Sequence, residues 1–420
     1  MALNVSTDRR LVRAGSRSIR YLTVGYTAVD APRRTERLPL DIAIVIDKSG
    51  SMAGSKLELA KVAARRAVEL LSPRDHVALV AYDSEVELLA AGALLAAGHR
   101  AELLRSIDRL QAGTMTNLSG GWLTGCQQVA SSGREHSVAR TLLLSDGLAN
   151  QGITDRDELQ RHAQELRTRG VVTSCFGIGN DFDERLMEGM ARAGGGNFYY
   201  LERAEQIPDY LASELGEALE VVARGVTLDV EADPGIEIGT LEQRPLSHDG
   251  NRTRILLGDL VSRQQVETVV RVTFPRRDPG ALLGVRVRLS DVDLKLDEAS
   301  VAIDWEVADH HANDRQPRDS AVDIVVAGRY AAKARNAAAE HNRAGNLEAA
   351  RQELIATARR IRQYAGSNPE LREVADQLEQ EARRHEEVFS PSMLKHELAM
   401  NYYAREGKQA DGRKRRSPMV

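Results

Sequence analysis

The chain has 420 residues, of which 42% are hydrophobic and 28% charged, a balance typical of globular proteins with two or three domains. A formal net charge of −4 argues against general affinity for nucleic acid, and no apolar segment approaches the roughly 20 residues needed to cross a bilayer. The first ten residues lack the apolar segment of a secretory leader, so we expect a cytoplasmic protein with no membrane partner. Cys126 and Cys175 are expected to be free, buried thiols.

Residues 1–40 are predicted to form an N-terminal strand and a linker. Residues 18–28 alternate apolar and polar side chains and are rich in Tyr, Val and Thr, which predicts a half-buried strand. A single strand is not stable alone, so we expect it to pair with a strand from later in the chain.

Residues 42–46 are all apolar, and such a run predicts a buried central strand. Asp47, Ser49 and Ser51 follow it at every second position, on the loop at the carboxyl end of the strand, where open α/β sheets bind ligands. One carboxylate and two hydroxyls are hard oxygen donors of the kind that Mg²⁺ prefers. The alternative interpretation is that both serines only turn the chain and cap a helix.

The segment 41–220 alternates strand and helix patterns, which predicts a mostly parallel sheet with helices on both faces. Strands are expected at 77–82, 86–90, 141–145, 171–179 and 197–201, and helices at 54–71, 100–111, 119–131, 155–169, 183–192 and 205–219. Thr116 lies between two of these helices, and Asp146 follows the apolar strand 141–145.

Asp47, Ser49 and Ser51, followed by Thr116 and Asp146, resemble the complete metal-ion-dependent adhesion site of a von Willebrand factor type A (VWA) domain. The resemblance implies a Rossmann-like VWA domain over 41–220, within a multidomain protein of bacterial type. It also implies that both serines bind a divalent ion directly, that Thr116 binds directly or through water, and that the aspartates hold coordinated waters or bind directly. The expected ion is Mg²⁺, with Ca²⁺ or Mn²⁺ as alternatives.

The same resemblance implies a non-enzymatic, metal-dependent protein interaction module or scaffold, in which a partner's Asp or Glu completes the shell of the ion. Binding would shift the last helix of the domain, as in the family. The scaffold would serve a bacterial stress, defence or kinase–phosphatase signalling system. One alternative is an adaptor subunit of an AAA+ ATPase of the MoxR or chelatase type, which would be a separate protein because this chain has no Walker motif.

A metal-dependent hydrolase is a second alternative. Hydrolysis usually requires a general base beside the ion or a second ion. No histidine motif accompanies the site, and Asp83, Asp181 and Asp183 are the only candidates for holding a second ion. We therefore predict that the protein is not an enzyme. Because the site lies at the rim of the sheet, Asp47→Ala is expected to abolish ion binding while leaving the fold largely intact.

Residues 221–306 contain alternating strand patterns separated by turn signals, which predicts an antiparallel β sandwich. The VWA domain is expected to be inserted in this sandwich, with strand 18–28 completing it, or to precede it. Residues 320–404 are predicted to be a C-terminal helical hairpin that acts as a docking arm or as a stabilising appendage. Residues 405–420 form a basic tail and are expected to be disordered.

Overall fold

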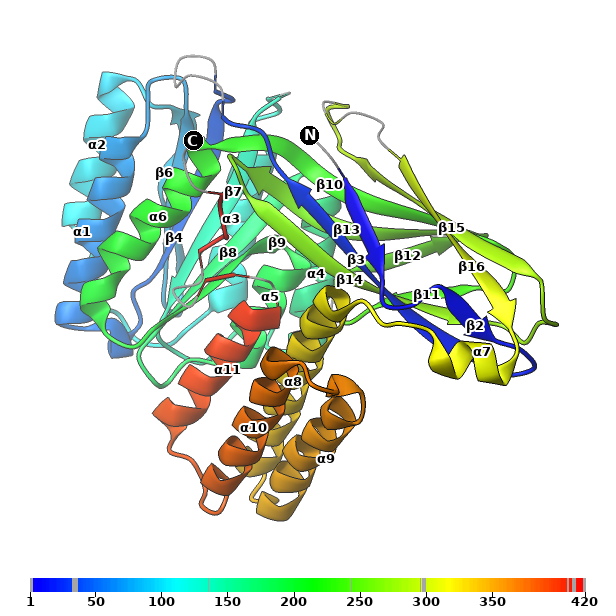
Figure 1. The fold of residues 1–420 in the computed structure, drawn as a ribbon. Coiled ribbons are helices and arrows are strands. Elements are labelled where there is room, and N and C mark those ends of the chain that lie inside the picture. The colour runs from blue at the N-terminus through cyan, green and yellow to red at the C-terminus, as the bar shows by residue number, and fades with distance from the viewer. Residues whose placement is uncertain are drawn as a thin grey trace. The chain divides into compact units, whose positions relative to one another are not determined.

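The computed structural model describes residues 3–31, 37–134, 136–242, 244–294, 296, 300–405, 408–409 and 413–417. The chain divides into two compact units, coloured along the sequence in Figure 1. One unit consists of residues 30–224 and 258–262, and the other of residues 1–29, 225–257 and 263–420. The first unit is therefore inserted, in sequence, between segments of the second. None of the helices in the described part of the chain has the length and apolar composition required to cross a membrane.

The inserted unit is built on a six-stranded sheet with the strand order β6-β5-β4-β7-β8-β9. All neighbouring strands are parallel except the edge strand β6, which is antiparallel to β5. The strands are β4 (Leu40–Asp47), β5 (His76–Tyr82), β6 (Val86–Leu94), β7 (Val138–Ser145), β8 (Val171–Ile178) and β9 (Gly195–Leu201). Every residue of β4 is buried, as its continuous apolar sequence predicted.

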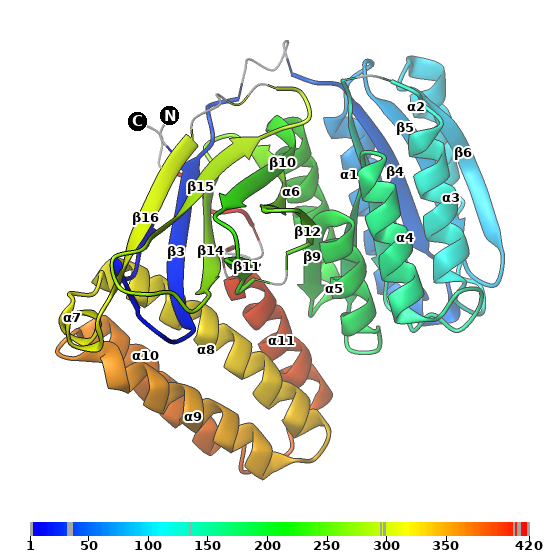
Figure 2. The ribbon, with the colours of Figure 1, turned by 90° about the vertical axis from the view of Figure 1, so that its right-hand side faces the viewer.

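Helices cover both faces of this sheet (Figures 1 and 2). Ile44 of β4 faces a core shared with α1, α2 and α6, whereas its neighbour Val45 faces Gly125 of α3. Successive side chains of a strand point to opposite faces, so this alternation places α1 and α3 on opposite sides. The helices are α1 (Ser55–Leu70), α2 (Ala97–Asp108), α3 (Leu118–Ala130), α4 (Arg156–Thr168), α5 (Glu184–Ala193) and α6 (Ile207–Leu219).

A buried ion pair attaches α6 to the sheet. Arg140 of β7 donates to the Glu214 carboxylate of α6 at 2.5 Å, and both side chains are almost fully buried. Ser174, Asn197 and Tyr199 donate to the same carboxylate at 2.6, 2.7 and 2.7 Å. Helix α6 is therefore held by a charged network as well as by its apolar face.

The second unit contains two sheets of mostly antiparallel strands, with the strand orders β1-β3-β14-β11 and β12-β13-β10-β15-β16-β2. Strand β3 pairs antiparallel with β14 over ten residues, from Ser18 opposite Phe274 to Thr27 opposite Gln265. Phe274 packs against Trp305 of the other sheet at a centroid distance of 5.0 Å. The strands are β1 (Asn4–Thr7), β2 (Leu11–Arg13), β3 (Ser18–Thr27), β10 (Val221–Ala232), β11 (Glu237–Thr240), β12 (Leu246–Asp249), β13 (Arg252–Val261), β14 (Gln265–Phe274), β15 (Leu282–Ser290) and β16 (Ser300–Ala308).

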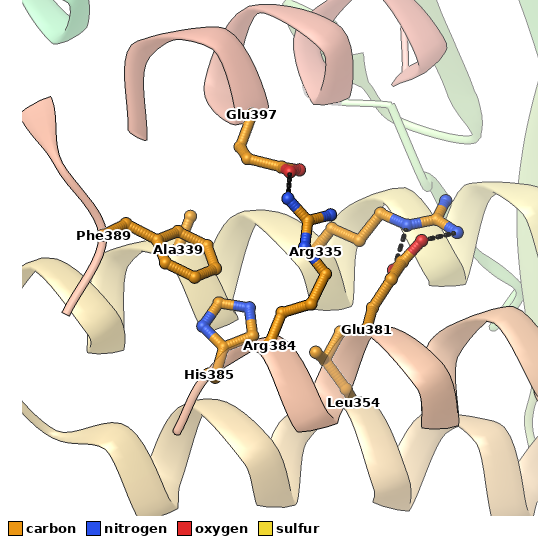
Figure 3. Close-up of a pocket in the computed structure, with 8 residues that line it drawn as sticks. All are labelled: Arg335, Ala339, Leu354, Glu381, Arg384, His385, Phe389 and Glu397. Atoms are coloured by element: carbon orange, nitrogen blue, oxygen red, sulfur yellow. Dashed lines mark hydrogen bonds and ion pairs between the residues drawn. The ribbon is translucent and has the colours of Figure 1, made fainter. Parts of the chain in front are cut away.

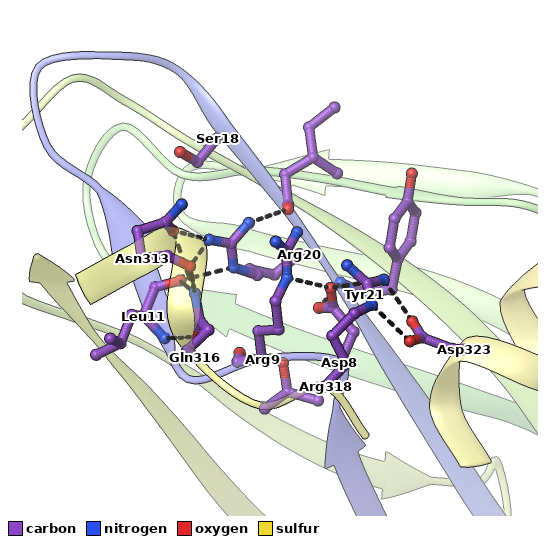
Figure 4. Close-up of polar contacts among 12 residues, drawn as sticks. Asp8, Arg9, Leu11, Ser18, Arg20, Tyr21, Asn313, Gln316, Arg318 and Asp323 are labelled. Carbon is purple, nitrogen blue, oxygen red and sulfur yellow. Dashed lines mark hydrogen bonds and ion pairs between the residues drawn. The ribbon is translucent and has the colours of Figure 1, made fainter. Parts of the chain in front are cut away.

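A buried polar cluster joins the N-terminal strands to the helices that follow the sandwich (Figure 4). Arg20 of β3 donates to the carbonyl of Leu11 at 2.8 Å and to Asn313 at 2.6 Å. Asp8 accepts from the backbone of Tyr21 at 2.8 Å. Burial lowers the pKa of Arg20 to about 10, and the nearby charge of Asp8 acts in the opposite direction, so Arg20 stays charged at neutral pH. The cluster fixes where the helical part begins.

The C-terminal part contains more helices than the predicted hairpin. It contains α7 (His310–Arg315), α8 (Ser320–Arg343), α9 (Leu347–Ala365), α10 (Pro369–Arg384) and α11 (Pro391–Arg405). Helices α8, α9 and α10 share an alanine-rich core, and α11 packs on α8. Helix α10 ends at Arg384, and α11 follows the break at Ser390–Pro391.

A cavity of about 10 Å³ lies between α8, α10 and the start of α11 (Figure 3). Arg335 and Glu381 pair beside it at 2.7 Å, and Arg384 pairs with Glu397 at 2.9 Å. Such a volume holds about one water molecule, so this cavity is not a ligand site.

Part of the basic tail is ordered, contrary to the prediction of disorder. The carbonyl of Arg415 accepts from the backbone of Gln265 at 2.9 Å, and Ser417 donates to the carbonyl of Arg263 at 3.0 Å. The backbone groups of Gln265, the first residue of β14, and of Arg263 just before it are the partners of the tail. The composition of the tail does not predict these backbone hydrogen bonds.

Candidate metal centre

Strand β4 carries Asp47 to the carboxyl edge of the parallel sheet. One carboxylate oxygen of Asp47 accepts from the backbone of Ser49 at 2.8 Å, and the other accepts from the hydroxyl of Ser145 at 2.6 Å. Burial raises the pKa of Asp47, and the hydrogen bonds from Ser145 and Ser49 act in the opposite direction. Because Ser145 ends the adjacent strand β7, these bonds fix the carboxylate where the two strands end.

Ser49 and Ser51 lie in the turn that follows β4. Their hydroxyl oxygens are 3.2 Å apart, and the Ser51 hydroxyl donates to Asp146 at 2.7 Å. Neither serine caps a helix: Ser49 makes no capping bond to the short 3₁₀ turn Gly50–Met52, and α1 begins after Gly54. The interpretation of these serines as simple helix caps is therefore wrong.

The Thr116 loop meets the same place. The backbone of Thr116 donates to the Asn150 side chain at 3.0 Å, and Asn150 donates back to the carbonyl of Thr116 at 3.2 Å. These bonds join the loop before α3 to the loop after β7. A Cβ atom on Gly147 would lie 3.3 Å from the Thr116 hydroxyl and 3.6 Å from that of Ser51, so both hydroxyls face this glycine.

The five side chains suggested by the sequence thus converge from three loops: Asp47, Ser49, Ser51, Thr116 and Asp146. They offer two carboxylates and three hydroxyls. The described residues contain no cluster of three or more His, Cys, Asp or Glu side chains that could hold a metal ion. Two carboxylates and three hydroxyls suit a hard cation that keeps several waters, such as Mg²⁺, better than a soft one.

The carboxylates proposed for a second ion have other partners. Asp83 pairs with Lys48 at 3.1 Å. Asp183 caps α5 through the backbone of Leu186 and pairs with Arg156 at 2.7 Å. Asp181 is exposed. These contacts do not favour a second metal site.

One side chain at the site was not recognised from the sequence. Lys56, in the first turn of α1, lies 2.5 Å from the second oxygen of Asp146. A lysine is unfavourable at a helix N-terminus, where the backbone N–H groups already carry partial positive charge. Its position therefore provided a signal that it pairs with an acid elsewhere.

Comparison of sequences matches residues 41–213 to the family described as von Willebrand factor type A domain. The strand order of the sheet and the helices on both of its faces agree with this match. Residues 41–213 form a VWA domain. The uncharacterized protein YfbK of Escherichia coli K12 is 30% identical over 228 residues, which cover 53% of this chain and 38% of YfbK. An uncharacterized protein of Synechocystis is 24% identical over 298 residues, which cover 68% of this chain and 69% of that protein.

Solved structures extend the likeness beyond the VWA domain. A von Willebrand factor type A protein from Catenulispora acidiphila superposes with a TM-score of 0.70 at 18% identity, covering 85% of each chain. The ArnB paralog VWA2 from Sulfolobus acidocaldarius gives 0.63 at 17% identity, covering 96% of this chain and 97% of that one. At such identities the likeness shows a shared fold. The chain spans well under half of YfbK, so the activity of the whole of that relative does not transfer.

Proposed function

We propose that this protein is a non-enzymatic interaction scaffold whose VWA domain binds a partner through a divalent ion. Asp47, Ser49, Ser51, Thr116 and Asp146 would hold the ion, with Mg²⁺ the best match to their oxygen donors. The observation that carries the proposal is the meeting of three loops, in which Ser51 contacts both Ser49 and Asp146 while Thr116 faces Gly147.

The donor chemistry supports an acidic group on the partner. Three of the five donors are uncharged hydroxyls and Mg²⁺ usually keeps several waters, so a further carboxylate could replace one of these waters. The surface beside the site supports a protein as the source of that carboxylate. Met115, next to Thr116, is 50% exposed, and Leu148, in the loop after Asp146, is 56% exposed. These two side chains would offer a protein partner apolar contact area beside the ion.

The positions of His76 and His136 support binding rather than hydrolysis. His76 begins β5, and His136 precedes β7, so both lie at the amino ends of strands, at the edge of the sheet opposite the site. A general base must lie within hydrogen-bond reach of the reacting group. Cys126 and Cys175 are free and buried, which is compatible with the cytoplasmic, reducing compartment that we propose.

Capture of partners in Mg²⁺ and in EDTA tests the proposed function. Immobilised wild-type protein should retain a partner in Mg²⁺ and release it in EDTA, and Asp47→Asn should retain none. Retention that is equal in EDTA would contradict a metal-dependent contact. Recovery of a ring-forming ATPase would favour the adaptor alternative, and metal-dependent turnover by the isolated chain would favour the hydrolase.

Thr116→Ala is expected to weaken partner binding more than ion binding. The two serines and both aspartates would still surround the ion, so Mg²⁺ affinity should fall by no more than about tenfold, the worth of one lost polar contact. The loop that carries Thr116 also carries Met115, so its position should matter more for the partner. Calorimetry with Mg²⁺ and partner retention on the same protein measure the two effects. Thr116→Ser, which keeps the hydroxyl, is the control and should behave like the wild type.

A further inference from the structure

Lys56 places a positive charge inside the metal site. Its ammonium is 2.5 Å from Asp146, whose side chain is fully buried, while Lys56 itself is 28% exposed. A Cβ atom on Gly179, which follows β8, would lie 3.8 Å from the same ammonium. The lysine therefore reaches across the carboxyl ends of the strands, where the proposed ion ligands meet.

Asp146 has two neighbours that use different oxygens. Ser51 donates to one oxygen at 2.7 Å, and Lys56 donates to the other. A divalent ion held by Asp146 would have to share this carboxylate with Lys56 or move the lysine away. Sharing would bring two like charges together in a partly buried site, where screening by water is weaker than in bulk solvent. Moving the lysine away would break its ion pair with Asp146.

The charges of the site give this arrangement a second consequence. Asp47, Asp146 and Lys56 together carry one net negative charge when ionised. A bound divalent ion would leave this group with one net positive charge, whereas without the lysine it would be neutral. The surplus charge is what an approaching carboxylate would neutralise.

We propose that Lys56 is a built-in competitor of the metal ion, which lowers the affinity of the site for divalent cations and keeps the loaded site positive for a partner's carboxylate. This inference rests on the proposed function, because it concerns the same ion. It assigns to Lys56 a positioning and charge-tuning role that is distinct from the role of the five ligands.

The test compares Mg²⁺ titrations of the full-length wild type and Lys56→Met by calorimetry. Methionine keeps an unbranched apolar stem but removes the ammonium, so the variant should bind Mg²⁺ about tenfold more tightly or better, the effect of removing one nearby like charge at partial screening. Lys56→Arg, which retains the charge, should stay close to the wild type. Lys61→Met is the matched control, because Lys61 lies on the same helix and pairs with Glu58 at 2.7 Å instead.

A second titration uses acetate as the carboxylate probe, with chloride of equal ionic strength as the reference. Acetate should increase the Mg²⁺ affinity of the wild type more than that of Lys56→Met. Equal or weaker Mg²⁺ binding by Lys56→Met would overturn the inference while leaving the metal site in place. Absence of Mg²⁺ binding in both proteins would overturn the metal site itself, and the inference with it. A gain that Lys61→Met shows equally would mean that only the overall charge of the protein matters, which also overturns the role of Lys56.

Discussion

Asp47→Asn is expected to abolish divalent-ion binding, and with it the stabilisation that Mg²⁺ gives to the folded protein. The substitution removes one of only two carboxylates at the site and puts an amide, which is a far weaker cation ligand, in its place. A ligand present at 100 times its dissociation constant stabilises the native state by about 2.7 kcal/mol. Thermal unfolding with and without Mg²⁺ should therefore show an upward shift of the melting temperature for the wild type and none for Asp47→Asn.

Asparagine is a better replacement than alanine because Asp47 is more deeply placed than the sequence suggested. Its side chain is fully buried and accepts from Ser49 and Ser145, so Asp47→Ala would affect the fold more than the expectation of a largely intact fold allowed. Alanine would leave these donors without their acceptor, at a cost of about 1–3 kcal/mol. Asparagine keeps the shape and one carbonyl oxygen, which separates loss of the ion from loss of the fold.

The metal-free proteins provide the internal control for this experiment. Burial raises the pKa of Asp47, which means that its charge is unfavourable in the folded state, and the nearby charge of Asp146 adds to this cost. In EDTA, Asp47→Asn should therefore unfold at a temperature equal to or above that of the wild type. A variant that melts much earlier in EDTA would show a folding defect, and a variant that keeps the full Mg²⁺ shift would count against Asp47 as a ligand.

The parts of the fold that follow from local patterns could be predicted from the sequence. The continuous apolar residues 42–46 predicted a strand buried on both faces, and all of β4 is buried. The alternation of strands and helices predicted the parallel sheet, and the carboxyl-end rule then placed Asp47 and Asp146 at one edge. Spacing within a few residues and one topological rule were sufficient for these inferences.

Contacts between distant residues could not be predicted in this way. Lys56 and Asp146 are separated by 90 positions, and no periodic pattern relates a lysine on a helix to an aspartate on a loop. The number of helices in the C-terminal part was underestimated for a similar reason, since the apolar positions of α11 indicate a buried face without identifying α8 as its partner. Glu214 reads as an ordinary charged residue on an amphipathic helix, yet its side chain is completely buried.

Glu214→Gln is expected to destabilise the VWA domain by about 3 kcal/mol, because removing one partner of a buried ion pair leaves the other charge uncompensated. Arg140 would keep the more distant carboxylate of Asp259, at 3.6 Å, and the weaker influence of Glu217. The matched control is Asp209→Asn on the same helix. Asp209 pairs with Arg66 at 3.2 Å but is 74% exposed, so its loss should change stability by less than about 0.5 kcal/mol. Denaturant unfolding of the three proteins measures the difference.

The pH dependence of this difference identifies the ion pair as its source. Burial alone would raise the pKa of Glu214, but the charge of Arg140 and the hydrogen bonds from Asn197, Ser174 and Tyr199 outweigh it and hold the pKa below its ordinary value of 4.5. The same pairing raises the pKa of Arg140.

A carboxyl group whose pKa is depressed by folding stabilises the protein above its unfolded pKa and loses that contribution as the pH falls through its folded pKa. The advantage of the wild type over Glu214→Gln should therefore be complete at neutral pH and shrink progressively below about pH 4.5. A difference that stays constant down to pH 3 would mean that glutamine disturbs packing rather than charge. A partner-driven shift of α6 at neutral pH would have to move this hydrogen-bonded network together with the helix or break it. The difference in unfolding free energy between the wild type and Glu214→Gln would then approximate the cost of breaking the network.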